Sequence, residues 1–238
     1  MSSRVFIAIL CLGVSACSQT TAPSPSATYR RPVVRLYAYE RFAPKDGPAC
    51  DGNVTTETPA AATVKPLSPS VKEKIDRATL LYNQQRLLEA LKLIEPVYEA
   101  EPENHFVIDS YARILFRMND RARSFDVYTK LIKMLDTRRS CKNEIVIDFW
   151  FIEAYWKKGI LHLDRGEWRE AAYEISRAYA GMNEPTIVDQ ALGYLTEAFY
   201  NLRDYELARY YAEATLQQNP KNLYVQKYID QMNASNVK

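Results

Sequence analysis

The alternation of apolar and polar positions predicts paired amphipathic helices after residue 70, most clearly within Asp189–Asn222. In that stretch one set of residues recurs at i, i+3, i+4 and i+7, which is the spacing of one helical face: Leu192, Leu195, Thr196 and Phe199. A second such set follows the polar turn at Asn201–Asp204: Ala208, Ala212, Thr215 and Leu216. Pro220 ends the second helix because proline cannot continue it.

The same arrangement recurs at intervals of about 34 residues. Four units are expected, followed by one more amphipathic helix at 223–233: 71–104, 105–138, 152–185 and 189–222. Pro96 should kink the second helix of the first unit. The apolar run before residue 152 breaks the spacing and indicates an insertion.

The repeated unit resembles the tetratricopeptide (TPR) pattern. Gly159 stands where two helices cross, Ala90 stands early in a second helix, and Pro102 and Pro220 close their units. The second unit departs from the pattern, since Ser124 replaces the alanine. The resemblance implies an all-α solenoid of helical hairpins whose final helix caps the stack with a polar outer face.

The first seventeen residues are typical of an export signal: Arg4 precedes an apolar run that is too short to span a bilayer. Val14–Cys17 resembles the bacterial lipobox, which implies removal of residues 1–16 and acylation of Cys17. Ser18 rather than Asp follows that cysteine, which by resemblance to enterobacterial sorting rules implies an outer-membrane anchor facing the periplasm. The alternative is an ordinary secretory signal that happens to end near a cysteine.

Two thiols, Cys50 and Cys141, remain in such a mature chain, because Cys11 leaves with the signal and Cys17 is acylated. An oxidising compartment favours a disulfide between them. The alternatives are two unpaired thiols or a redox or metal site, although the sequence has no Cys-x-x-Cys.

Residues 17–70 read as a tether, since most of the chain's 12 prolines fall there among Ser, Thr and Ala. Within it, Val33–Phe42 is aromatic and β-prone. This segment could dock on the repeats, present a strand to a partner, or stay disordered.

Composition and the absence of known catalytic motifs exclude several classes of function. Lys and Arg total 31 against 29 Asp and Glu, which lacks the basic excess of a nucleic-acid-binding protein. No nucleophile elbow, metalloprotease helix, phosphate loop or dinucleotide fingerprint occurs. His105 and His162 are far apart and are interpreted as structural. We therefore expect no enzyme, no cofactor and no metal site.

The TPR resemblance implies a groove lined by the first helix of each unit. Carrying the family's inward positions over gives a set of candidate partner-binding residues: Tyr82, Arg113, Phe116, Arg117, Trp156, Ile160, Leu163, Glu197 and Tyr200. Aromatic residues together with Arg113 and Arg117 would suit a partner segment with apolar anchors and an acidic group.

The layout is similar to small TPR outer-membrane lipoproteins that assemble pili and secretins. It implies a lipid-anchored scaffold that binds envelope proteins. The alternative is an adaptor for cell-wall hydrolases or proteases, or for outer-membrane protein assembly.

Overall fold

The computed structural model describes residues 31–42, 66–136, 149–182 and 184–234. The expected signal peptide, the acylation site Cys17 and the pair Cys50 and Cys141 lie outside these ranges. Within them every regular element is helical. No helix in these ranges has the length and hydrophobicity needed to cross a bilayer.

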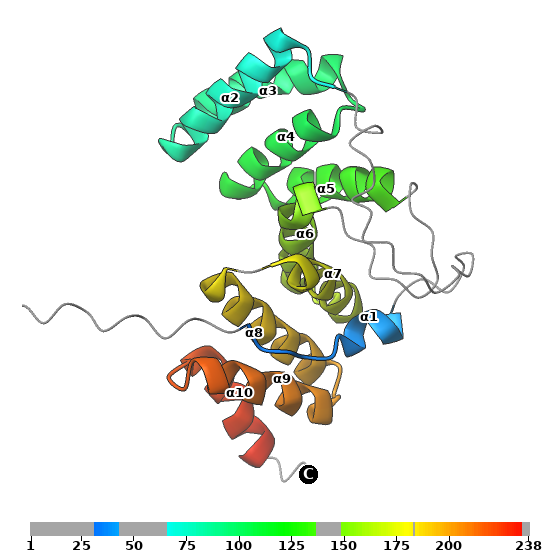
Figure 1. Ribbon diagram of the computed structural model, residues 1–238, viewed down its shortest axis with the longest axis vertical. Helices are drawn as coiled ribbons and strands as arrows, with labels where there is room; N and C mark the ends of the chain where they lie inside the picture. Colours follow the sequence, from blue (N-terminus) through cyan, green and yellow to red (C-terminus); the bar gives the residue numbers. More distant parts are fainter. Residues whose placement is uncertain (1–30, 43–65, 137–148, 183, 235–238) are drawn as a thin grey trace, which may run out of the picture. The chain divides into compact units, whose positions relative to one another are not determined.

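Eight helices form four consecutive hairpins, each made of helices that contact each other (Figure 1). Successive hairpins also touch, through α3 with α4, α5 with α6, and α7 with α8. The fold class predicted from the sequence, a TPR-like helical-hairpin solenoid, is confirmed. The helices are α2 (Pro69–Asn83), α3 (Leu87–Ala100), α4 (His105–Arg117), α5 (Arg121–Asp136), α6 (Ile152–Asp164), α7 (Trp168–Gly181), α8 (Pro185–Asn201) and α9 (Tyr205–Gln218).

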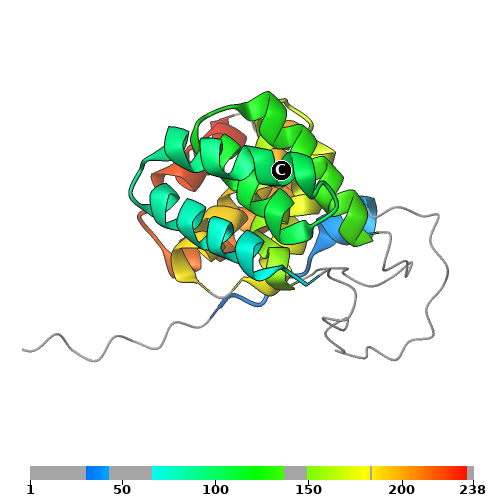
Figure 2. The ribbon, with the colours of Figure 1, turned by 90° about the horizontal axis from the view of Figure 1, so that it is seen from above.

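Three shorter or terminal elements complete the described chain. Helix α1 (Tyr37–Phe42) precedes the hairpins, and the 3₁₀ helix η2 (Phe149–Phe151) leads directly into α6. Helix α10 (Leu223–Ala234) contacts both α8 and α9, where a final capping helix was expected. Figure 2 gives a second view of the same stack, with α2 and α3 side by side.

The four hairpins share one turn. In each turn a single residue has a positive φ, between 61° and 71°, and the following amide bonds back to a carbonyl near the end of the first helix at 2.9–3.0 Å. This is the geometry of a Schellman-type helix end. The positive-φ residues are Gln85, Asn119, Gly166 and Arg203.

The helices approach closely where the pattern has small residues. A Cβ added to Gly159 of α6 would lie 2.6 Å from Ile175 Cγ1 and 3.2 Å from the Ile175 backbone nitrogen in α7. Ile175 is fully buried. The glycine at this crossing is therefore required by space, as the sequence pattern predicted.

A buried charge joins the second and third hairpins. The Arg177 guanidinium of α7 is fully buried and bonds to Asp136 at the end of α5 and to Glu174. It also lies 4.0 Å from the centre of the Tyr155 ring. A buried cation needs such partners, because desolvation would otherwise outweigh its attraction to one carboxylate.

Residues 31–42, called the strap below, dock on the repeats. The Tyr211 hydroxyl of α9 donates to the Arg35 carbonyl at 2.8 Å and accepts the Tyr37 N–H at 3.2 Å. The Arg35 N–H donates to the Tyr210 hydroxyl at 2.9 Å. Tyrosine hydroxyls thus take backbone groups that a neighbouring strand could have taken. The segment pairs with no strand in the described part of the chain, and its second half forms α1.

Side chains at both ends of the strap hold it in place. The Arg31 guanidinium donates to the Tyr179 carbonyl and lies 4.3 Å from the centre of that ring. The Tyr179 hydroxyl donates to the Pro32 carbonyl at 2.6 Å. At the other end Phe42 stacks on Phe199 of α8 at 6.2 Å. Of the three sequence alternatives for this segment, the structure shows docking on the repeats.

Gly159→Ala should lower the free energy of unfolding by about 1–3 kcal/mol, because the new methyl group overlaps buried Ile175. Gly193→Ala is the matched control. It is also helical, and its nearest contact is a Tyr224 side-chain atom at 3.3 Å. Both variants gain the same helix propensity, so urea unfolding should separate them by the overlap alone. Equal stabilities would show that the α6–α7 crossing has room.

Candidate functional site

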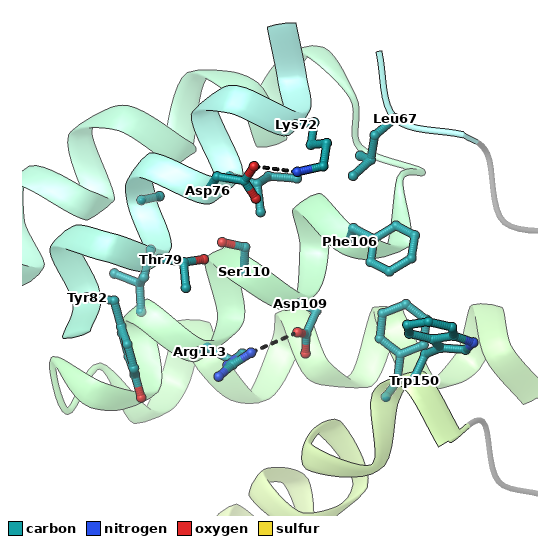
Figure 3. A pocket seen from close by; sticks show the side chains of 14 residues that line it. Leu67, Lys72, Asp76, Thr79, Tyr82, Phe106, Asp109, Ser110, Arg113 and Trp150 are labelled. Atoms are coloured by element: carbon teal, nitrogen blue, oxygen red, sulfur yellow. Dashed lines mark hydrogen bonds and ion pairs between the residues drawn. The ribbon is translucent and has the colours of Figure 1, made fainter. Parts of the chain in front are cut away.

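A cavity of about 290 Å³ lies where α2, α4 and η2 meet (Figure 3). Its position on first helices of neighbouring hairpins is the face on which the sequence predicted a groove. We call it the first-helix pocket. Its lining is Leu67, Lys72, Ile75, Asp76, Ala78, Thr79, Tyr82, Phe106, Asp109, Ser110, Arg113, Ile114, Trp150 and Phe151.

Helix α4 supplies one wall through residues at i, i+3, i+4 and i+7: Phe106, Asp109, Ser110 and Arg113. The start of α4 sets which face this is. The buried Asn104 side chain accepts the Phe106 N–H at 3.2 Å and so caps the helix. The wall changes from aromatic at the start of the helix to charged two turns later.

The other walls come from α2 and η2. Helix α2 begins at a capping serine, since the Ser68 hydroxyl accepts the Val71 N–H at 3.3 Å. In η2 the buried Phe151 ring lies 5.4 Å from the Phe106 ring. Trp150 beside it is 70% exposed and lines the pocket. Figure 3 shows Phe106 and Trp150 at one end and Tyr82 and Arg113 at the other.

Both cations that line the pocket are held by carboxylates. Arg113 lies 3.1 Å from Glu153 of α6 and 3.8 Å from Asp109 Oδ2. Lys72 forms an ion pair with Asp76 one turn along α2. The Arg113 pKa is raised although burial opposes its charge, because Glu153 and Asp109 attract the guanidinium.

Among the carboxylates of the site, Asp109 has the most strongly shifted pKa. Its side chain is 17% exposed, and burial raises its pKa to about 7. Arg113 opposes this shift and Glu153 adds to it. Among the described residues, no donor forms a hydrogen bond to Asp109 Oδ1, although that atom is buried. A buried acceptor without a donor is uncommon in folded proteins and needs an explanation.

Two of the nine residues expected in the groove, Tyr82 and Arg113, line this pocket. The Arg113 guanidinium lies 5.8 Å from the centre of the Tyr82 ring. Arg117 is exposed one turn farther along and donates to the Gln85 side chain at 3.3 Å. Phe116 is half-buried between two cations, Arg121 and Lys157.

The structure places the other five away from the pocket. Trp156 is only 5% exposed, and its ring lies 5.4 Å from that of Tyr194 in α8, so it offers little surface to a partner in this arrangement. Ile160 and Leu163 are half-buried against the core. Helix α10 contacts the last two: the Tyr224 hydroxyl donates to Glu197, and the Tyr228 ring lies 5.1 Å from Tyr200.

Sequence reasoning did not identify Asp109 or Trp150. Asp109 had a detectable signal, because an acid stands between Ile108 and Tyr111, both of which the helical spacing assigns to the buried face. Trp150 had none, since it lies in the insertion, where no repeat spacing applies. Within the described ranges, no group of three or more His, Cys, Asp or Glu side chains could hold a metal ion.

Solved structures of MamA have a similar arrangement of helices. The MamA RS-1 ArsTM double mutant has a TM-score of 0.57 at 14% identity over 73% of this chain and 88% of its own. MamA 41-end from Desulfovibrio magneticus RS-1 has a TM-score of 0.55 at 14% identity, over 72% of this chain and 88% of its own. Identity this low shows likeness of fold alone. No protein-family model and no curated protein matches the chain.

The raised pKa of Asp109 predicts a specific dependence of stability on pH. Its folded-state pKa of about 7 exceeds the unfolded value of about 4, so unfolding releases a proton from this site between those values. The contribution of Asp109 therefore becomes unfavourable as pH rises from about 4 to about 7, by roughly 2–4 kcal/mol in total.

Asp109→Asn should remove this pH-dependent contribution to stability, because the amide does not titrate. Urea unfolding at pH 5 and pH 8 should show the variant gaining on the parent protein at the higher pH. Asp126→Asn, at an exposed position of α5, is the control and should follow the parent at both. Parallel curves for the parent and Asp109→Asn would contradict the shifted pKa.

Proposed function

We propose that this protein is a lipid-anchored scaffold that binds protein partners in the periplasm and serves the assembly of an envelope machine, such as a pilus or a secretin complex. The observation that supports partner binding most directly is the first-helix pocket. It is concave, has an aromatic end and a charged end, and is lined by residues from three separate elements. Pockets of this composition bind side chains of partner proteins.

The helical-hairpin fold supports the same role. A stack of hairpins presents an extended surface built from many first helices, and its stability comes from neighbour contacts that leave this surface available. Peptide recognition by a groove needs apolar anchors and a few polar groups. Phe106 and Trp150 offer the first, and Asp109 and Arg113 offer the second.

The anchor is supported by the sequence alone. Val14–Cys17 resembles a lipobox, and a short polar segment that includes Pro23 and Pro25 separates Cys17 from the strap. Several acyl chains on one residue give stable membrane attachment where one chain is marginal. A tethered scaffold would hold its partners at the inner face of the outer membrane, where pilus and secretin subunits assemble.

Cys17→Ser should move the protein from the outer-membrane fraction to the soluble periplasm, because it removes the residue that accepts the lipid. Metabolic labelling with palmitate followed by density-gradient fractionation measures both effects. Cys50→Ser, which changes a different cysteine of the mature chain, should keep the label and the membrane location. A labelled Cys17→Ser protein would exclude this anchor.

A strain that lacks the gene should fail to place a secretin or pilus subunit in its outer membrane, and the parent gene should restore it. Trp150→Ala should restore it poorly, because loss of an interface anchor costs more than about 1 kcal/mol of binding. Leu88→Ala, at a position of α3 that is 66% exposed and outside the pocket, is the control.

Immunoblotting of outer-membrane fractions measures how much of the secretin or pilus subunit has been assembled there. Normal assembly in the deletion strain, with altered levels of a cell-wall hydrolase, would refute the machine-assembly role in favour of the adaptor alternative. Full restoration by Trp150→Ala would instead refute the pocket as the binding site.

A further inference from the structure

The first-helix pocket is lined by two cations, Lys72 and Arg113, and two acidic residues, Asp76 and Asp109. Each lining cation has a carboxylate partner, Lys72 through Asp76 and Arg113 through Glu153 and Asp109. An incoming acidic group would have to compete with carboxylates already in place. The acidic partner segment that the sequence indicated through Arg113 and Arg117 is therefore poorly matched here.

Whereas the cations of the pocket have partners, one oxygen of the Asp109 carboxylate lacks a hydrogen-bond donor. Asp109 Oδ1 is buried and, over the described part of the chain, accepts no hydrogen bond. Arg113 approaches only the other oxygen, at 3.8 Å, and lies closer to Glu153. A buried acceptor of this kind is stabilised strongly by any donor that reaches it, and most strongly by a charged one.

The surroundings of Asp109 are polar on several sides without supplying that donor. Arg113 belongs to its own helix, while Tyr82 of α2, Tyr128 of α5 and Glu153 of α6 face the same cluster. The Tyr128 hydroxyl is also buried and forms no hydrogen bond among the described residues. Glu153 takes the closer contact with Arg113, at 3.1 Å, and also lies 3.8 Å from Lys157. Asp109 has only the longer contact with Arg113, at 3.8 Å.

The neighbouring end of the pocket is apolar. Figure 3 shows the Asp109 carboxylate lying between Arg113 on one side and the rings of Phe106 and Trp150 on the other. Leu67 and Phe151 complete that end. Aromatic faces also attract cations, which adds to the pull of the carboxylate.

We infer that the first-helix pocket binds a partner segment that places a lysine or arginine against Asp109 and an adjacent large apolar side chain between Phe106 and Trp150. The inference rests on the proposed function and specifies its partner. The cation supplies the missing donor to Oδ1, and the apolar neighbour fills the aromatic end. Partners would be selected by this pair of side chains.

The test uses three terminally blocked peptides that differ at one position, with phenylalanine followed by lysine, glutamine or glutamate. The full-length protein in detergent carries 5-fluorotryptophan, and the ¹⁹F resonance of Trp150, assigned with Trp150→Phe, reports binding. At pH 8 the lysine peptide should bind at least about tenfold more tightly than the glutamine peptide, as expected for a charge-assisted hydrogen bond. The glutamate peptide should bind most weakly.

Asp109→Asn should make the lysine and glutamine peptides equal, whereas Asp126→Asn, outside the pocket, should keep the preference. At pH 6 the preference should shrink in the parent protein, because the pKa of Asp109 is about 7 and its carboxylate is then largely protonated.

Equal binding of all three peptides, or a lysine preference that survives Asp109→Asn, would overturn this inference and leave the proposed function standing. A Trp150 resonance that no peptide shifts would overturn the pocket as a partner site, and the inference with it.

Discussion

One turn, repeated four times, sets the geometry on which the rest of the structure depends. In each hairpin a residue in the left-handed region reverses the chain, and the next amide closes the end of the first helix. Gly166 adopts this conformation without steric strain and asparagine tolerates it, whereas at Gln85 and Arg203 it costs about 1–2 kcal/mol that the rest of the fold must offset. Because the turns are equivalent, each second helix returns along its first helix in the same way, and small residues such as Gly159 let the two approach closely.

The pocket arises where this regularity is interrupted. Regular stacking places α2 beside α4, and between units two and three the chain adds residues before α6 begins. Their last part, η2, carries Phe151 into the core beside Phe106 and leaves Trp150 largely exposed. A strictly periodic array would have lacked this third wall. The repeated hairpins thus provide two walls of the pocket, and the inserted residues before α6 provide the third.

Much of the fold could be predicted from sequence, because helical periodicity and turn position are local properties. Gly159 and the capping helix could be placed for that reason. The site could be predicted only in part. Tyr82 and Arg113 follow from their repeat positions, but the burial of Trp156 depends on Tyr194 in the next unit. The strap was misread as β-prone because its backbone partners, the hydroxyls of Tyr210 and Tyr211, lie about 175 residues away.

The strap and the pocket use different helices, and this separation matters for a tethered scaffold. The strap bonds to α7 and α9 and stacks on α8, whereas the pocket belongs to α2, α4 and η2. Tension on an anchor at Cys17 would therefore be taken up at Tyr179 and Tyr211, without touching the residues that line the pocket. On the proposed function, attachment and partner capture can each change without disturbing the other, because no side chain of the pocket lining also holds the strap.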